Sequence, residues 1–111
     1  MNRILKINQI ESLKFNERGL IPVITQCHET REVLMMAWMN KKAIELTVQY
    51  NKVTYFSRSR NKLWEKGETS GNYQILKKLI TDCDKDTLLA IVEQKGVACH
   101  KGSRSCFTEK K

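Results

Sequence analysis

The sequence of 111 residues has one proline, five glycines, and no repeated or low-complexity segment. Because Gly- and Pro-rich stretches are typical of linkers, their scarcity indicates that the chain is not divided into parts. Hydrophobic residues make up 41% of it, which is typical of a folded chain. We expect one domain over residues 1–111, in which residues 1–12 are an N-terminal extension and residues 108–111 a polar tail.

Long apolar runs are also missing. No run approaches the roughly 18 residues of a membrane-spanning helix, and charges interrupt the first residues where a signal peptide would be apolar. We therefore expect a cytoplasmic protein without membrane contact. Acidic residues are outnumbered, which gives a net charge of +8. This charge fits either a lysine-rich soluble surface or an anionic partner, such as nucleic acid or a phosphorylated small molecule.

Short apolar, β-branched runs separated by polar turns predict the secondary structure. Residues 20–29 and 32–40 predict a hairpin whose second strand is buried. Asn40 is placed to cap a helix over residues 41–50. Residues 72–81 fit either a helix or one face of a strand. With further strands over 53–59 and 87–94, the pattern predicts a strand-rich α+β domain with mixed sheets and one main helix.

The chain lacks a C-x-x-C pair, which disfavours a zinc ribbon and a thioredoxin-type redox site. Its cysteines are expected to be thiols or metal ligands rather than disulfides. Cys27 lies in an apolar strand and is predicted to be a buried small hydrophobe. Cys83, Cys99 and Cys106, with His100 beside them, are candidate zinc ligands. Three protein ligands would leave a position for water, whereas four would close the site.

The segment "TDCDKD" at 81–86 alternates carboxylates with other residues. If it is extended, Asp82, Asp84 and Asp86 project from one face and Cys83 from the other. The carboxylates are then candidate ligands for Mg²⁺ or Ca²⁺, and the thiol for zinc. The alternative is a solvated acidic turn. An EF-hand is disfavoured, because Thr87 stands where that loop requires glycine.

Residues 57–71, "SRSRNKLWEKGETSG", combine basic side chains with a glycine-flanked hydroxyl pair. Arg and Lys bind phosphate, and exposed N–H groups of such a loop add donors. The Walker pattern G-x-x-x-x-G-K-[ST] is absent. The alternative is an exposed basic loop whose tryptophan is buried in the core. Lys101 and Arg104 of a later loop could add to this anion-binding wall. The candidate substrate-binding residues are Arg58, Arg60, Trp64, Lys66, Gly67, Glu68, Thr69, Ser70 and Arg104.

Five segments in order, "EVLMMAWMN", "YFSRSR", "LWEKGETSGN", "DCDKD" and "EQKGVACHKGSRSCF", resemble the phosphoribosyl-AMP cyclohydrolase family. The resemblance runs from about residue 13 to residue 107. It implies an intertwined homodimer, zinc held by Cys83, Cys99 and Cys106 from both subunits, and magnesium held by Asp82, Asp84 and Asp86. It also favours a strand before "DCDKD". The chain departs from the family at Cys27, Asn72 and Val97, where Asp, His and Pro are common.

The resemblance implies an enzyme of histidine biosynthesis that opens the adenine ring of a phosphorylated nucleotide by hydrolysing the N1–C6 bond. Zinc would activate the attacking water. His100 is our candidate proton shuttle, and Glu68 a second one. The deaminase signature H-x-E…P-C-x-x-C is absent, which favours ring opening over loss of the exocyclic amine. The competing hypothesis, a zinc-stabilised basic nucleic-acid-binding module, is disfavoured by three cysteines without matched pairs.

Overall fold

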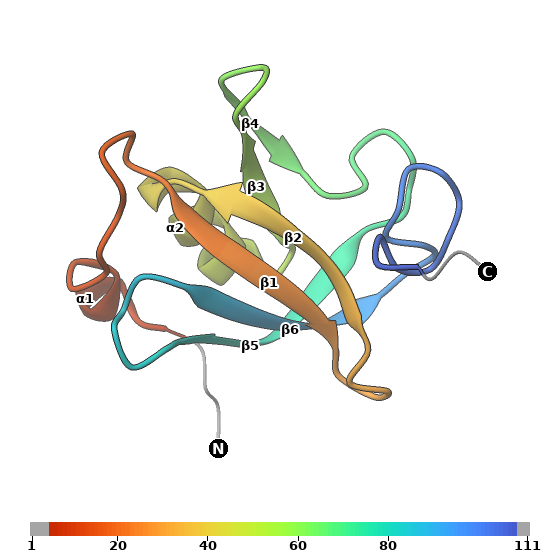
Figure 1. Cartoon of the computed structure of the whole chain (residues 1–111), viewed down its shortest axis with the longest axis horizontal. Coiled ribbons are helices and arrows are strands. Elements are labelled where there is room, and N and C mark those ends of the chain that lie inside the picture. Colours follow the sequence, from red (N-terminus) through yellow and green to blue (C-terminus); the bar gives the residue numbers. More distant parts are fainter. Residues whose placement is uncertain (1–4, 109–111) are drawn as a thin grey trace.

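The computed structural model describes residues 5–108, which form two β-sheets and two helices (Figure 1). The sheets and helices confirm the predicted strand-rich α+β class. In chain order, the elements are α1 (Ile7–Ile10), β1 (Ile21–Cys27), β2 (Val33–Met39), α2 (Lys41–Tyr50), β3 (Thr54–Ser57), β4 (Lys62–Glu65), β5 (Gln74–Thr81) and β6 (Leu88–Gln94).

The larger sheet is mixed and has the strand order β2-β1-β6-β5. Strands β1 and β2 form the predicted hairpin, β6 runs parallel to β1, and β5 is antiparallel to β6. The prediction that the second strand of the hairpin is buried is wrong, because β2 is the edge strand of the sheet and exposes Val33 and Met36. Residues 72–81, which fitted two structures, contain strand β5. Pairing with β6 along its length satisfies the backbone hydrogen bonds of β5. A non-local contact therefore decides between helix and strand, which the local spacing of apolar residues could not do.

The predicted helix is α2, and its cap is the predicted residue. The Asn40 side chain accepts a hydrogen bond of 2.8 Å from the N–H of Ala43, and Ala43 and Ile44 are fully buried. The helix ends at Asn51, which has the left-handed φ of 59° that asparagine tolerates. Helix α2 contacts β3, so it supports the small sheet of β3 and β4 beside the larger one.

Replacing Asn40 with Ala is expected to lower the free energy of unfolding by about 1 kcal/mol, because the first turn of α2 loses its side-chain acceptor. Urea unfolding at one fixed protein concentration measures this. Asn40→Asp, which keeps an acceptor, should stay close to wild type. Equal losses in both variants would show that the cap is not the cause.

Two elements were not predicted. Strand β4 lies inside the segment expected to be a basic loop, and pairs with β3 from Thr54↔Glu65 to Ser57↔Lys62. Helix α1 lies in the expected N-terminal extension, where Leu5 and Ile10 belong to the core. Residues 1–4 of that extension, and all of the polar tail except Thr108, lie outside the described residues.

Buried polar side chains tie the two sheets together. The Tyr55 hydroxyl from β3 lies 2.7 Å from the Thr25 hydroxyl of β1 and donates to the Gln74 side chain of β5 at 2.6 Å. The Gln74 amide donates in turn to Gln94 of β6 at 2.8 Å. Because buried polar groups need such partners, this network fixes how the small sheet sits on the large one.

A search of the described residues finds no helix with the length and hydrophobicity needed to cross a membrane.

Candidate active site

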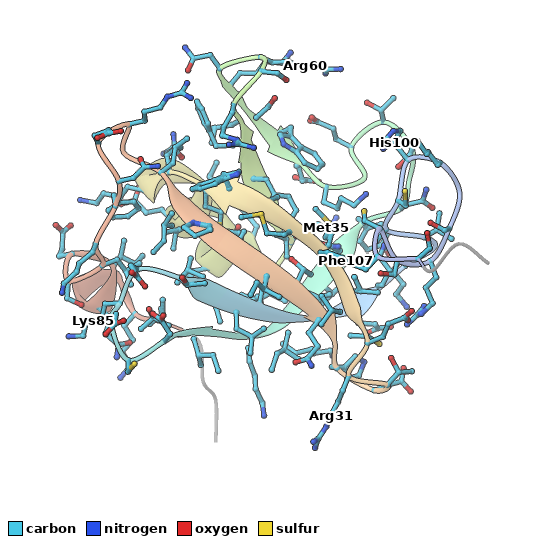
Figure 2. All side chains as sticks on the ribbon, viewed as in Figure 1. Arg31, Met35, Arg60, Lys85, His100 and Phe107 are labelled. Carbon is cyan, nitrogen blue, oxygen red and sulfur yellow. The ribbon has the colours of Figure 1, made fainter. Side chains whose placement is uncertain are left out.

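The predicted metal ligands lie in two loops at opposite ends of strand β6. Residues 82–87, the acidic loop, join β5 to β6, and residues 95–107, the thiol loop, follow β6. A seven-residue strand is about 23 Å long, so the two loops are far apart within one chain. Figure 2 shows Lys85 of the acidic loop and His100 of the thiol loop at opposite ends of the molecule.

The acidic loop is a turn, so the prediction of an extended segment with alternating faces is wrong. Lys85 has a φ of 61°, and one Asp82 carboxylate oxygen accepts the N–H groups of Asp86 and Thr87 at 3.2 and 3.3 Å. An aspartate that accepts nearby backbone N–H groups favours a turn over a strand. The turn still gathers Asp82, Asp84 and Asp86, whose ligand atoms all lie within 4.8 Å of one another.

These hydrogen bonds also affect the ionisation of Asp82. The largest single effect, loss of solvation, acts to raise the pKa of its carboxyl. The N–H groups of Asp86 and Thr87 outweigh that effect and hold the pKa below its usual value. Asp82 is therefore a carboxylate over the physiological range, as a ligand for a hard cation must be.

Backbone hydrogen bonds fold the thiol loop into a tight structure beside the edge strand β2. Ala98 donates to the carbonyl of Arg104 at 2.9 Å, and Cys99 to that of Ser103 at 3.1 Å. The N–H of Cys106 then donates to the Leu34 carbonyl of β2 at 2.7 Å. This folding brings the thiols of Cys99 and Cys106 near enough to affect each other's pKa, although seven positions separate them.

The two thiols differ in acidity. The N–H of Lys101 donates to Cys99 Sγ at 3.5 Å and, with the Ser103 side chain, lowers the pKa of Cys99. Protein atoms around the sulfur of Cys106 raise the pKa of that thiol, and the neighbouring Cys99 acts in the same direction. A pair of thiols of which one ionises readily is a suitable donor set for a soft cation.

Lys66 lies behind these thiols. It is only 8% exposed, and its ammonium donates to the Ala98 carbonyl at 2.9 Å. Burial lowers the pKa of Lys66, while Cys106 and Cys99 act to raise it. Lys66 therefore brings positive charge to the thiols and holds the start of their loop.

A cavity of about 650 Å³ opens in front of Cys106 and joins most of the predicted substrate-binding residues. Ring stacking in it is available from Trp64, which is half-buried with its ring centroid 5.1 Å from that of Tyr55. Trp64 thus combines its two predicted roles, packing against the core and facing a cavity. The predicted residues that line the cavity are Arg60, Trp64, Lys66, Gly67, Glu68, Thr69, Ser70, His100 and Cys106.

The loop after β4 depends on glycine at one point. Gly67 has a φ of 88°, and a Cβ there would lie 2.5 Å from the backbone nitrogen of Tyr73. No other residue fits such a close approach of two backbones. The contact places Glu68, Thr69 and Ser70 on the cavity wall.

The other predicted site residues do not line this cavity in the single chain: Cys99 lies in the thiol loop beside it, the three aspartates and Cys83 lie in the acidic loop, and Arg58 and Arg104 lie elsewhere. The Arg58 guanidinium lies 4.7 Å from the ring centroid of Trp38. Arg104 donates to Glu32 at 2.8 Å and to Cys27 Sγ at 3.0 Å, so it anchors the thiol loop from the side away from the cavity lining. Cys83 is exposed in the acidic loop. Cys27 is 3% exposed, which confirms the predicted burial.

Some cavity residues were not predicted. Met35, Met36 and Ala37 of β2 and Ala98 of the thiol loop complete the lining. Strand β2 is apolar throughout, so its sequence does not show which of its faces is exposed to solvent. Met36 is 43% exposed, which is unusual for such a residue in a strand and becomes visible only in the structure.

The donor sets fit two kinds of metal. Three clustered carboxylates suit a hard cation such as Mg²⁺, and thiolates suit zinc. Among the described residues, however, no third His, Cys, Asp or Glu side chain joins Cys99 and Cys106. One chain therefore offers a whole carboxylate cluster but only part of a thiolate site.

The chain is a strand-rich α+β domain whose cavity gathers an aromatic ring, a lysine, a histidine and a thiol, side chains that are typical of an enzyme site. Residues 35–108 match the family described as phosphoribosyl-AMP cyclohydrolase. The chain is 52% identical over 109 residues to the phosphoribosyl-AMP cyclohydrolase of Chlorobium limicola, covering 98% of this chain and 80% of that one. It is 60% identical over 95 residues to that of Granulibacter bethesdensis, covering 86% and 74%.

The chain belongs to the phosphoribosyl-AMP cyclohydrolase family and is therefore a hydrolase. A histidine biosynthesis bifunctional protein of Thermoanaerobacter pseudethanolicus is 58% identical over 100 residues, covering 90% of this chain and 46% of that protein. The similarity thus extends to part of a longer relative.

Proposed function

We propose that this enzyme hydrolyses the N1–C6 bond of the adenine ring of phosphoribosyl-AMP, a step of histidine biosynthesis that takes place in the cytoplasm. Family membership supports the substrate. The observation that carries the proposal is the cavity that joins Trp64, the loop 67–70 and His100 beside Cys106. Its size, about 650 Å³, lies within the range of small-molecule sites.

Different residues of the cavity would bind different parts of the substrate. Trp64 offers a ring face for the adenine, since stacking on an aromatic ring suits any base. The hydroxyls of Thr69 and Ser70 and the guanidinium of Arg60 offer donors for phosphate oxygens. In this proposal the ring would lie between Trp64 and the thiol loop, and the phosphates toward the loop after β4.

The bond change requires two proton transfers. Water attacks C6, the C6–N1 bond breaks with its electron pair left on N1, and C6 becomes a carboxamide carbon. One proton leaves the attacking water and another reaches N1. His100 lines the cavity next to Cys99 in sequence, and an imidazole can both accept and donate a proton, which suits both transfers.

We propose Cys83 of one subunit and Cys99 and Cys106 of another as the ligands of a zinc ion, and Asp82, Asp84 and Asp86 as those of a magnesium ion. When bound, zinc would bring the pKa of a water ligand to about 7. The carboxylate cluster is next to Cys83, so the second copy would bring both to the cavity. The magnesium ion would there offset phosphate charge.

The homodimer in this proposal has support from the surface next to Cys106. Four large apolar side chains are exposed there on β1, on β2 and at the end of the thiol loop: Ile24, Val33, Met36 and Phe107. Ile24 and Met36 are cross-strand partners, and Ser105 ties the loop to the carbonyl of Val33. Adjacent exposed apolar side chains of this size are typical of an interface. Two-fold symmetry would then give two identical sites per dimer.

Purified protein supplied with phosphoribosyl-AMP should change the ultraviolet absorbance of the adenine ring, and a zinc chelator should stop the change. Product mass should rise by one water. No absorbance change with zinc and magnesium present would contradict the proposal, and loss of the exocyclic amine instead would point to a deaminase.

His100→Ala is expected to lower kcat by about 10²- to 10⁴-fold, as loss of a general acid–base does, with the zinc content unchanged. Glu68→Gln is the matched comparison, because Glu68 lines the same cavity and is the other candidate. A larger loss in Glu68→Gln than in His100→Ala would transfer the role to Glu68.

Asp84→Asn is expected to raise the Mg²⁺ concentration needed for half-maximal activity by about tenfold or more, because a neutral amide is a poorer ligand for a hard cation. Lys85→Asn is the control. It changes the charge of the same exposed loop, and asparagine tolerates the left-handed φ of 61°. If the activity of both wild type and Asp84→Asn were independent of the Mg²⁺ concentration, the carboxylate cluster would be a solvated turn and not a metal site.

A further inference from the structure

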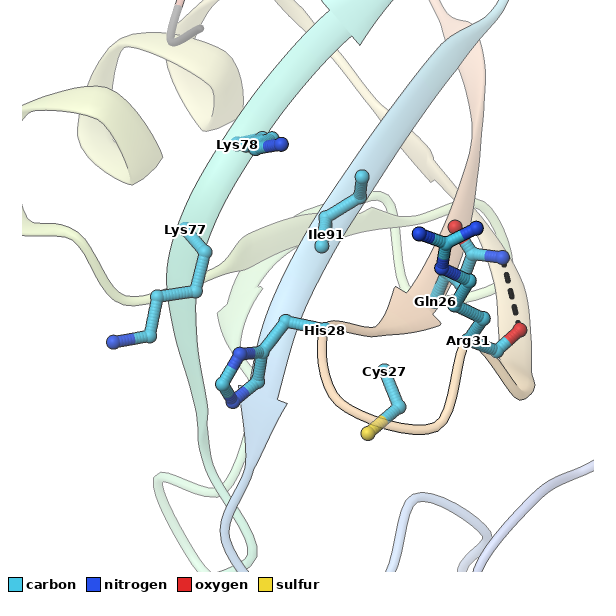
Figure 3. A pocket seen from close by; sticks show the side chains of 7 residues that line it. All are labelled: Gln26, Cys27, His28, Arg31, Lys77, Lys78 and Ile91. Atoms are coloured by element: carbon cyan, nitrogen blue, oxygen red, sulfur yellow. Dashed lines mark hydrogen bonds between the residues drawn. The ribbon is translucent and has the colours of Figure 1, made fainter. Parts of the chain in front are cut away.

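A second cavity, of about 520 Å³, lies over strands β5 and β6 and shares no lining residue with the candidate active site. We call it the basic groove, and its main lining residues are Gln26, His28, Arg31, Lys77, Lys78 and Ile91. Figure 3 shows Ile91 between the two lysines of β5 on one side and Gln26 and Arg31 on the other. We propose that the basic groove is a separate anion site that binds the phosphoryl groups of a small molecule.

A β-bulge places both lysines on this face. Leu76 pairs with Val92 and Lys78 with Ile91, so the register shifts and Lys77 is the extra residue. In a regular strand successive side chains alternate between faces, but here Lys77 and Lys78 are both exposed and both line the groove. Bulges of this kind re-aim side chains and are common next to functional sites.

Arg31 reaches the groove from a second backbone irregularity. Its φ is 64°, a left-handed conformation in which a residue with a long side chain is uncommon. Two hydrogen bonds hold it there: its N–H donates to the Cys27 carbonyl at 3.0 Å, and its carbonyl accepts from the Gln26 amide at 2.9 Å. Strain held in this way is typical of functional positions, and here it directs a cation to the groove.

The positive charge of the groove is only partly compensated. Lys77 lies 3.7 Å from Glu93, but Lys95 is closer to that carboxylate at 2.6 Å. His28 lies 3.6 Å from Glu29. Within residues 5–108, Arg31 and Lys78 form no ion pair. An anion that bound here would therefore gain two unpaired cations, one of them a guanidinium that can make two parallel hydrogen bonds to phosphate.

The size of the groove indicates what kind of anion it takes. A space of about 520 Å³ matches a small molecule, while a nucleic acid needs an extended basic stripe. Ile91 forms an apolar floor between the cations, so a ligand with both a phosphoryl group and an apolar part fits best. Inorganic phosphate, pyrophosphate and AMP share the phosphoryl group and differ in the rest.

The test is an NMR titration of the full chain at low ionic strength with pyrophosphate, followed by inorganic phosphate and AMP. We expect the amide signals of Gln26, Lys78 and Ile91 to shift with each ligand. The double variant Arg31→Gly, Lys78→Gln should weaken this binding at least tenfold, about the value of one charge-assisted hydrogen bond. Glycine suits the left-handed φ of position 31, so this change should not harm the fold.

Lys42→Gln is the control for loss of a lysine charge elsewhere on the surface. Lys42 is exposed on α2 and lines none of the cavities described above, so its loss should change the affinity less than twofold. Signals of Thr69 and Ser70 report the candidate active site in the same spectra. Their response should persist in the double variant, which separates failure of this inference from failure of the proposed function.

Three results would overturn the inference. The first is no shift at the groove, or one that the double variant leaves unchanged. The second is tighter binding of a single-stranded oligonucleotide than of pyrophosphate through the same residues. The third is a lower dimer fraction of the double variant in sedimentation, which would mean that the acidic loop of a second copy fills the groove.

Discussion

Cys99→Ala is expected to abolish zinc binding and to lower the rate of ring opening by at least about 10³-fold. The thiol loop contributes two of the three proposed zinc ligands, Cys99 and Cys106, and only Cys106 would remain in it. Without the ion, the pKa of the attacking water returns to that of bulk water, far above neutrality, so almost no hydroxide forms at neutral pH. Zinc content from elemental analysis and kcat from the absorbance assay measure the two effects together.

Cys27→Ala is the matched control for this experiment. It also removes one thiol, but Cys27 is buried behind the thiol loop and does not line the cavity. Zinc content should stay at the wild-type value, with only a modest loss of stability from the small cavity left behind. Turnover of Cys99→Ala in metal-free buffer at a rate near that of wild type would refute the zinc proposal.

Two inactive variants, Cys83→Ala and Cys99→Ala, are expected to restore activity when they are unfolded and refolded together. In a mixed dimer, one site would combine both defects, and the other would combine an intact Cys83 with an intact Cys99–Cys106 pair. Random pairing of equal amounts makes about half of the dimers mixed, so about a quarter of the wild-type sites should be active.

A second mixture checks the arrangement. Cys99→Ala and Cys106→Ala damage the same loop, so no mixed dimer of these two would contain an intact set, and activity should stay at background. If both mixtures remain inactive while zinc binds to each folded wild-type chain as a monomer, the ligands come from one chain and the shared site is wrong. The separation of the two loops by β6 makes that outcome hard to reconcile with the fold.

The sequence predicted those elements whose local signals agree with their surroundings. The hairpin of β1 and β2 follows from two apolar runs around a polar turn, and α2 follows from the cap at Asn40. Strand β4 was missed because "KLWE" has only two apolar residues, and its pairing with β3 and the packing of Leu63 and Trp64 against the core cannot be deduced from four residues. Helix α1 is equally short.

In the candidate site too, the sequence predicted the kinds of residue but not their geometry. The residue types indicated metal ligands, and the structure does gather the carboxylates of the acidic loop. Their geometry was predicted wrongly, because Asp82 uses its side chain to close a turn on the N–H groups of Asp86 and Thr87. The position of Arg58 over Trp38 depends on two strands that meet only in the folded chain.

The distance between the acidic loop and the thiol loop determines when a metal ion could act. In a zinc finger, the free energy of metal binding is folding free energy, because the unbound chain has no structure. Here each loop is formed by hydrogen bonds of its own, and a sheet separates the two. With ligands from two subunits, the free energy of zinc binding would stabilise the association of two already folded chains. Zinc would then regulate how many subunits are assembled, and the chain would need no metal to fold.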